Sequence, residues 1–210
     1  MEYFIMFFLL FVLGSFSGFL IETIWCMIRW RKIESRKGLI YGHFIPIYGL
    51  AVLFIAVVIE LLHIKKWYIL FLVTFFITGV VEYFSSLFQE KILGTLSWDY
   101  SNMKFNLHGR VNLVYLLGFS IFGVLWCKFY TKVFETFELL ISNEKLFVLI
   151  TMILFTFMIY NCFISFVATY RQKQRRNGVG AKNRFEVWLD KKYTDDYLKK
   201  VYANAKVVEE

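Results

Sequence analysis

Long apolar runs separated by short polar stretches are the dominant pattern of this chain. Five of them approach or exceed the roughly 20 residues of helix that cross a bilayer; they cover residues 3–28, 44–62, 67–88, 111–130 and 146–170. The second run is the shortest and has Pro46 in its first turn, where a missing N–H is tolerated. The pattern predicts an all-α polytopic membrane protein, with five transmembrane helices in residues 1–170 and a short amphipathic tail in residues 171–210.

Composition excludes an ordinary soluble domain, because 59% of the residues are hydrophobic, 25 are Phe and only one is Pro. Cys26, Cys127 and Cys162 fall in apolar runs without the spacing of metal ligands, so we interpret them as packing residues. The chain has no P-loop, GxSxG, HExxH or CxxC motif. We therefore expect no cofactor and no metal, and we favour a non-enzymatic role while leaving that question open.

Basic residues predict the orientation. Twelve lie in residues 29–37, 91–110 and 171–176, whereas five lie in the two remaining loops. We therefore expect a multi-pass protein of the plasma membrane. The positive-inside rule places its N-terminus outside the cell and its tail in the cytoplasm. The first run has no basic leader or cleavage site, so we expect a retained helix. We interpret the net charge of +8 as a sign that the protein contacts the lipid bilayer, and we expect no nucleic-acid partner.

Three glutamates stand in or at the ends of these runs, where charge is costly and usually faces a cavity, a partner or a substrate path. Glu22 follows Gly14 and Gly18 at a spacing of four, so the three share a helix face and the glycines permit close helix packing. Glu22 is either a functional carboxylate or a structural partner of a nearby arginine, and we favour function.

A second polar face lies on the third run, and it continues toward the predicted cytoplasmic side. Its members recur at helical spacing: Glu82, Ser85, Ser86, Gln89 and then Glu90. Such a stripe faces protein or water in a membrane. The stripe either forms hydrogen bonds with another helix or contributes to a binding site. We expect its two acids, Glu82 and Glu90, to contact Arg110, Lys91 or a bound cation.

The loop between the third and fourth runs is long and rich in aromatic and polar residues, which is typical of functional loops. Asp99 and Arg110 are the expected ion pair, and residues 108–112 are expected to cap the next helix. Arg110 is either a loop clamp or a ligand for a phosphate or carboxylate. The loop is also a candidate for a short interfacial helix. Three glycines and Pro46 in residues 38–49 indicate an irregular backbone, which membranes tolerate where it lines a cavity.

In the tail, Phe185, Trp188 and Leu189 recur at helical spacing after a glycine hinge, and Thr194 suits the start of a second helix. The tail either docks on a partner or the membrane surface, or folds back on the protein's own loops.

These features predict a polar intramembrane site for a substrate or ion near the cytoplasmic face. Its candidate residues are Glu22, Tyr48, Glu82, Ser86, Glu90, Trp98, Asp99, Tyr100, Asn106, His108, Arg110 and Asn112. The favoured function, a permease-like transporter subunit, is the one that the family resemblance given next implies. The alternatives are a membrane-embedded enzyme acting on lipid headgroups, with a Glu as general base and Arg110 on the phosphate, and a membrane scaffold or regulator whose acids are paired with basic residues.

The order of several short motifs resembles the CmpB-like family of integral membrane proteins, described as a putative ABC-transporter permease family. The matching segments are Gly18–Thr23, Tyr41–Gly49, Glu82–Ser86, Trp98–Ser101, Asn106–Arg110 and Tyr202–Lys206. The chain departs from the family pattern at His43, Ser97 and His108. The resemblance implies a polytopic bacterial membrane protein that takes part in transport. An ABC permease requires a separate ATPase subunit, and five spans are a small pore unit, so we also expect a homo-oligomer or another membrane subunit.

Overall fold

The structure is a computed structural model that describes residues 2–31, 34–143 and 145–208. It is 74% helical, and its strands have only two residues each. The long helices are α1 (Glu2–Trp30), α2 (Pro46–Leu62), α3 (Trp67–Phe88), α4 (Leu113–Asn143) and α5 (Lys145–Arg176). All except α2 are long and apolar enough to cross a membrane, whereas α2 has 17 residues. The all-α membrane fold is therefore confirmed with four candidate spans, and the fifth span stays a prediction.

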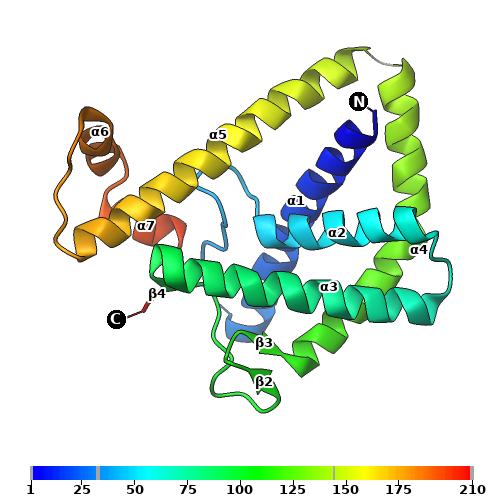
Figure 1. The fold of residues 1–210 in the computed structure, drawn as a ribbon, viewed down its shortest axis with the longest axis horizontal. Helices are drawn as coiled ribbons and strands as arrows, with labels where there is room; N and C mark the ends of the chain where they lie inside the picture. Colours follow the sequence, from blue (N-terminus) through cyan, green and yellow to red (C-terminus); the bar gives the residue numbers. More distant parts are fainter. Residues whose placement is uncertain (1, 32–33, 144, 209–210) are drawn as a thin grey trace.

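Three helices outline a triangle, and two cross its interior. In Figure 1, α3, α4 and α5 form the sides, while α1 and α2 run between them. One apolar core is shared by the four helices α1, α2, α3 and α4. It contains Leu10, Ala56, Leu70 and Tyr130, one residue from each helix. Much of the apolar surface of α3, α4 and α5 is exposed, as expected of helices that face lipid.

Glycines allow α1 and α2 to pack closely, as the spacing of Gly14 and Gly18 predicts. A Cβ on Gly18 would lie 2.3 Å from the Tyr48 ring, and a Cβ on Gly49 would lie 2.2 Å from Ser15 Oγ. Neither position has room for a larger residue. This contact places Tyr48 of α2 beside the half of α1 that carries Glu22.

Two helices extend beyond their predicted ends. We expected a loop after residue 130, but α4 continues to Asn143, and α5 continues through Arg176 instead of ending at residue 170. In α4, Phe134, Phe137 and Ile141 recur at helical spacing and pack against Ile5 and Met6 at the start of α1. The apolar run ends at residue 130, but the helical periodicity does not.

The loop between α3 and α4 is compact but is not an interfacial helix, so that prediction is wrong for described residues 94–112. The π-helix η1 (Gln89–Leu93) extends α3 and is followed by β1 (Thr95–Leu96). Then β2 (Asn106–Leu107) pairs antiparallel with β3 (Val111–Asn112). Positive φ angles at Phe105, His108 and Gly109 turn the chain sharply, which a helix does not permit.

The segment before α2 has an irregular backbone, as predicted, and α5 supplies its hydrogen bonds. Asn161 of α5, fully buried, accepts from the Tyr41 N–H at 3.1 Å and donates to the Tyr41 carbonyl at 2.7 Å. One turn later, Ser165 Oγ accepts from the Ile40 N–H at 2.9 Å. Non-helical backbone at membrane depth needs such internal partners. Lys32, one of the basic residues behind the predicted orientation, lies outside the described residues.

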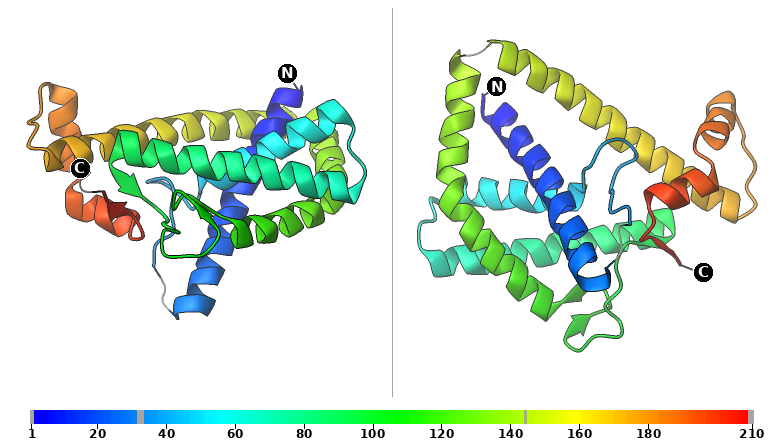
Figure 2. Two further views of the ribbon diagram at one scale, coloured as in Figure 1. Left: turned by 60° about the horizontal axis from the view of Figure 1, so that its bottom comes forward. Right: turned by 180° about the vertical axis from the view of Figure 1, so that it is seen from behind.

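The tail folds back on the protein, which decides between the two interpretations of its pattern. Helices α6 (Arg184–Lys192) and α7 (Asp195–Val201) form where expected, and Thr194 caps α7 by accepting from the Tyr197 N–H. They gather at the C-terminal end of α5 (Figure 2). Leu189 of α6, Leu198 of α7 and Tyr193 between the two helices are buried in a core with Ile40 and Ile164.

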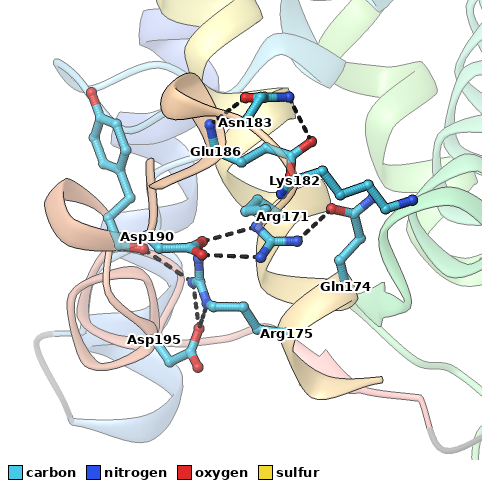
Figure 3. A network of polar contacts seen from close by, with 9 residues as sticks. Arg171, Gln174, Arg175, Lys182, Asn183, Glu186, Asp190 and Asp195 are labelled. Carbon is cyan, nitrogen blue, oxygen red and sulfur yellow. Dashed lines mark hydrogen bonds and ion pairs between the residues drawn. The ribbon is translucent and has the colours of Figure 1, made fainter. Parts of the chain in front are cut away.

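Charge and strand pairing complete the attachment of the tail. Arg171 of α5 donates two hydrogen bonds of 3.0 Å to Asp190, and Arg175 bridges Asp190 and Asp195 (Figure 3). The last strand, β4 (Lys206–Val207), pairs antiparallel with β1. The tail therefore connects α5, the irregular segment before α2 and the loop after α3.

Candidate functional site

Two glutamates and two tyrosines from four parts of the chain meet between α1, α2 and α3. The Tyr48 hydroxyl of α2 donates to Glu22 of α1 at 2.6 Å. The Tyr100 hydroxyl, from the loop after η1, donates to Glu82 of α3 at 3.0 Å. Both carboxylates act electrostatically on the Tyr100 hydroxyl, so the two pairs are neighbours. We call these four residues the acid–tyrosine cluster.

Packing and a backbone hydrogen bond hold Tyr100 in place within the cluster. Its ring stacks on Tyr115 of α4 with 5.2 Å between ring centroids, and its backbone N–H donates to the Gly109 carbonyl at 2.7 Å. Burial, followed by the negative charge of Glu82, raises the pKa of Tyr100 well above its ordinary value. The phenol therefore stays protonated and acts as a hydrogen-bond donor.

Glu82 is the least satisfied member of the cluster. The residue is only 7% exposed, and among the described residues its Oε2 atom has no hydrogen-bond partner. Among the residues that the structure describes, no Lys or Arg forms an ion pair with Glu22 or Glu82. An incompletely paired acid in a buried position calls for a proton, a cation or a ligand donor.

The other acid of the α3 stripe is paired. Arg110 forms an ion pair with Glu90 and donates to Ser86 Oγ at 3.3 Å, one helical turn beyond Glu82. The Trp98 indole donates to the Arg110 carbonyl at 2.8 Å. The predicted ion pair of Asp99 with Arg110 is wrong, because the Arg110 side chain points toward α3 and pairs with Glu90.

The remaining candidates hold the loop in shape. Asp99 accepts from the Ser101 hydroxyl at 2.6 Å, which lowers the pKa of the Asp99 carboxyl, and lies 3.8 Å from Lys206. Asn106 accepts from the Gly109 N–H at 2.8 Å. His108 contacts the Tyr83 hydroxyl through Nδ1 at 2.9 Å.

Asn112 starts the fourth helix. Its Oδ1 accepts from the Val114 N–H at 3.0 Å, and its Nδ2 donates to the Lys104 carbonyl at 2.8 Å. Among residues 108–112, which were expected to cap α4, it is thus the side chain of Asn112 that does so. Asn112 is fully buried, so its role here is to position the loop.

Sequence reasoning missed residues that support the site. Tyr115 carries the ring on which Tyr100 stacks, and Asn161 and Ser165 hold the segment that leads into Tyr48. Asn161, Ser165 and Thr169 are spaced by four in the fifth apolar run, so they form a polar face that could have been detected. Nothing comparable marks Tyr115.

The described residues contain no group of three or more His, Cys, Asp or Glu side chains able to hold a metal ion. Two surface hollows lie at the tail end of the molecule. One, of about 370 Å³, is lined by residues 181–184 and Val187, and the other, of about 230 Å³, lies between η1 and the end of α5. Neither is lined by Glu22 or Glu82.

Comparison with known proteins agrees with the helical membrane fold. No curated protein and no solved structure matches the chain. A family model described as "Putative ABC-transporter type IV", ABC_trans_CmpB, matches residues 9–166. The match includes α2, α3, α4 and the loop between α3 and α4, and most of α1 and α5. The chain therefore belongs to this ABC-transporter family, as the order of its short motifs predicts.

Proposed function

We propose that the chain is the membrane-embedded subunit of a transporter and that the acid–tyrosine cluster is its polar site. The observation that carries the proposal is Glu82, a buried carboxylate beside a second carboxylate, with one oxygen that has no hydrogen-bond partner in the described parts of the chain. Family membership and the four long apolar helices support the transporter class. The geometry supports the choice of residues.

The occupant of this site is a proton or a small cation. Two carboxylates that share a buried region repel each other unless a positive charge or a proton lies between them. The two phenolic hydroxyls donate to one oxygen of each carboxylate. The second oxygen of Glu82 meets no donor among the described residues, so it can accept a proton or coordinate a cation. An acidic intramembrane site of this composition is typical of ion and proton paths.

Energy for transport would come from a separate ATPase, because the chain has no P-loop. We propose that the tail and the loop between α3 and α4 face the cytoplasm, with the N-terminus outside. The basic residues of these segments support this orientation. A second copy or another membrane subunit would complete the translocation path.

Affinity purification of the tagged full chain from native membranes tests the ATPase partner. Mass spectrometry of the co-purifying proteins should find an ATPase in near-stoichiometric amount. Recovery of the chain alone, under conditions in which a known ABC permease keeps its ATPase, would exclude this partnership. The assignment of the acid–tyrosine cluster would not be affected by that outcome.

A ligand-response measurement on the purified chain tests the cluster itself. We expect the melting temperature to depend on pH or on added Na⁺ or K⁺, and Glu82→Gln to remove that response. Glu60→Gln is the matched control, because Glu60 accepts from the Tyr130 hydroxyl at 2.9 Å outside the cluster. If Glu82→Gln responds as the unmodified protein does, the cluster is a structural contact and the proposal fails.

A further inference from the structure

Helix α6 uses only part of its surface to fold back on the protein. Leu189 is buried in the core that includes Ile164 of α5. The next residue, Asp190, accepts two hydrogen bonds from Arg171 of α5. In Figure 1, α6 lies beside the C-terminal end of α5, outside the triangle formed by α3, α4 and α5. The helix therefore keeps an exposed surface of its own at the edge of the molecule.

Large apolar side chains stand on this exposed surface. Phe185, Val187 and Trp188 are between 39% and 45% exposed, although α6 has only nine residues. The rings of Phe185 and Trp188 stack on each other, with 5.7 Å between their centroids. A contiguous group of exposed apolar residues is typical of a surface that contacts a protein or a membrane.

Basic side chains surround these apolar residues. The exposed ones in and beside α6 are Lys182, Arg184, Lys191 and Lys192. None of the four forms an ion pair with a described Asp or Glu, and Lys192 Nζ lies 4.9 Å from the centre of the Trp188 ring. Of the acids in α6, Asp190 is bound by two arginines of α5, and Glu186 accepts from the Lys182 N–H at 2.6 Å. The exposed surface of α6 thus carries an excess of positive charge.

The attachment to α5 sets the level of α6 relative to a membrane. The apolar run within α5 ends at residue 170, and Arg171, which binds Asp190, is the next residue. Ile164 and Ala168, in the last two turns of that run, share a core with Leu189. Because α5 is long and apolar enough to cross a membrane, α6 lies where the hydrocarbon region meets the headgroups. Aromatic and basic residues are characteristic of that level.

We propose that the exposed surface of α6 lies on an anionic lipid surface and anchors the tail there. Its apolar side chains enter the boundary between headgroups and acyl chains, while the four cations contact lipid phosphates. The hollow of about 370 Å³ bordered by Lys182 and Arg184 gives a headgroup room at the start of the helix. Unpaired cations beside exposed rings at the end of a span favour lipid as the occupant. Folding back and membrane contact then use different parts of the same helix, and the proposal does not rest on the transport function.

Hydrogen exchange of the full chain in lipid nanodiscs tests the proposal. One set of nanodiscs contains phosphatidylcholine alone, and the other contains phosphatidylglycerol as well. Each cation near an anionic surface contributes about a fivefold preference, so the amides of α6 should exchange at least roughly thirtyfold more slowly in the second set. Equal exchange of α6 in the two lipids would overturn the proposal and leave this surface to a protein partner.

Matched variants separate membrane contact from folding. The double variant Arg184→Gln and Lys191→Gln removes two exposed cations and should reduce the difference between the lipids roughly thirtyfold. Its exchange in phosphatidylcholine alone should equal that of the unmodified protein, which shows that α6 stays folded. Lys65→Gln with Lys66→Gln makes the same change of charge at the turn between α2 and α3 and should leave the exchange of α6 unchanged. A double variant of α6 that keeps the full difference would also overturn the proposal.

Discussion

Two groups of acidic residues in this protein have opposite surroundings. In the acid–tyrosine cluster, Glu22 and Glu82 receive hydrogen bonds from neutral tyrosines. At the tail, Asp190 and Asp195 are enclosed by the guanidinium groups of Arg171 and Arg175. The contrast separates acids whose charge is already compensated from acids that still have capacity to bind.

The tail contacts show what a structural arrangement of charges looks like here. Arg171, with a side chain that is 3% exposed, fits Asp190 in a two-bond geometry. Burial tends to raise the pKa of Asp190, but the hydrogen bonds from Arg171 and Arg175 outweigh it, so the pKa lies below its ordinary value. Glu82, by contrast, has a buried oxygen for which the described residues offer no donor. We therefore assign a structural role to the charges of the tail, and a functional role for the cluster is what we propose.

The largest effect is expected from Arg171→Met, which leaves Asp190 without its bidentate partner. Asp190 keeps its contact with Arg175, so loss of the buried Arg171 guanidinium should destabilise the protein by about 2–3 kcal/mol, at or below the low end of the range for a buried ion pair. Thermal unfolding and limited proteolysis of the tail measure it. Lys200→Met, at an exposed position of α7, is the control and should be close to neutral. An unchanged tail in Arg171→Met would mean that these charges do not hold it.

Gly18→Ala should disturb the acid–tyrosine cluster, because the new Cβ would lie 2.3 Å from the Tyr48 ring and collide with it. Overpacking of this kind costs about 2 kcal/mol and should displace Tyr48 from Glu22. The melting temperature and the ion response both report it. Gly118→Ala is the matched control, since nothing lies within 4 Å of its Cβ. Loss of ion response without any loss of stability would contradict the packing explanation.

Glu82→Gln should change stability in the opposite direction to Arg171→Met. The amide keeps an acceptor for the Tyr100 hydroxyl and removes a buried charge, so we expect about 1 kcal/mol of stabilisation together with loss of the ion response. Thermal unfolding at neutral pH measures the sign, with Glu60→Gln as the reference. A destabilisation as large as that of Arg171→Met would place Glu82 among the structural charges.

Acid should release the tail gradually, which is the smallest effect. The pKa of Asp190 is lower in the folded protein than its ordinary value, so its charge stabilises the fold at neutral pH. That contribution disappears as the pH falls below the ordinary Asp range toward the lowered pKa. Hydrogen exchange of α6 and α7 at several acidic pH values checks this. Asp190→Asn should flatten the profile, and an unflattened profile would point to another group.

Local patterns predicted much of what the structure contains. The positions of the apolar helices, the close approach at Gly14 and Gly18, the irregular backbone before α2 and the Thr194 cap all follow from residue types a few positions apart. The end of α4 did not follow, because hydropathy falls at residue 130 while the contacts of Ile141 with Ile5 and Met6 keep the helix intact.

Partner choice was the part that the sequence left open. Arg110 could reach Asp99 or Glu90 by sequence distance alone, and the turn at His108 and Gly109 directs it to Glu90. Tyr100 meets Glu82 only because the loop folds over α3, where Tyr115 of α4 supports its ring. The pairing of β4 with β1 joins residues more than a hundred positions apart, which no local pattern encodes.

The sequence by itself therefore determined an all-α membrane protein of a transporter family and the residue types of the proposed polar site, because periodicity and short motifs are local properties. Only the tertiary structure decided which acids are compensated. Glu90, Asp190 and Asp195 are paired with arginines, whereas Glu22 and Glu82 lie together with tyrosines. Compensation of a buried charge depends on which distant side chain lies within hydrogen-bond reach, and packing sets that distance.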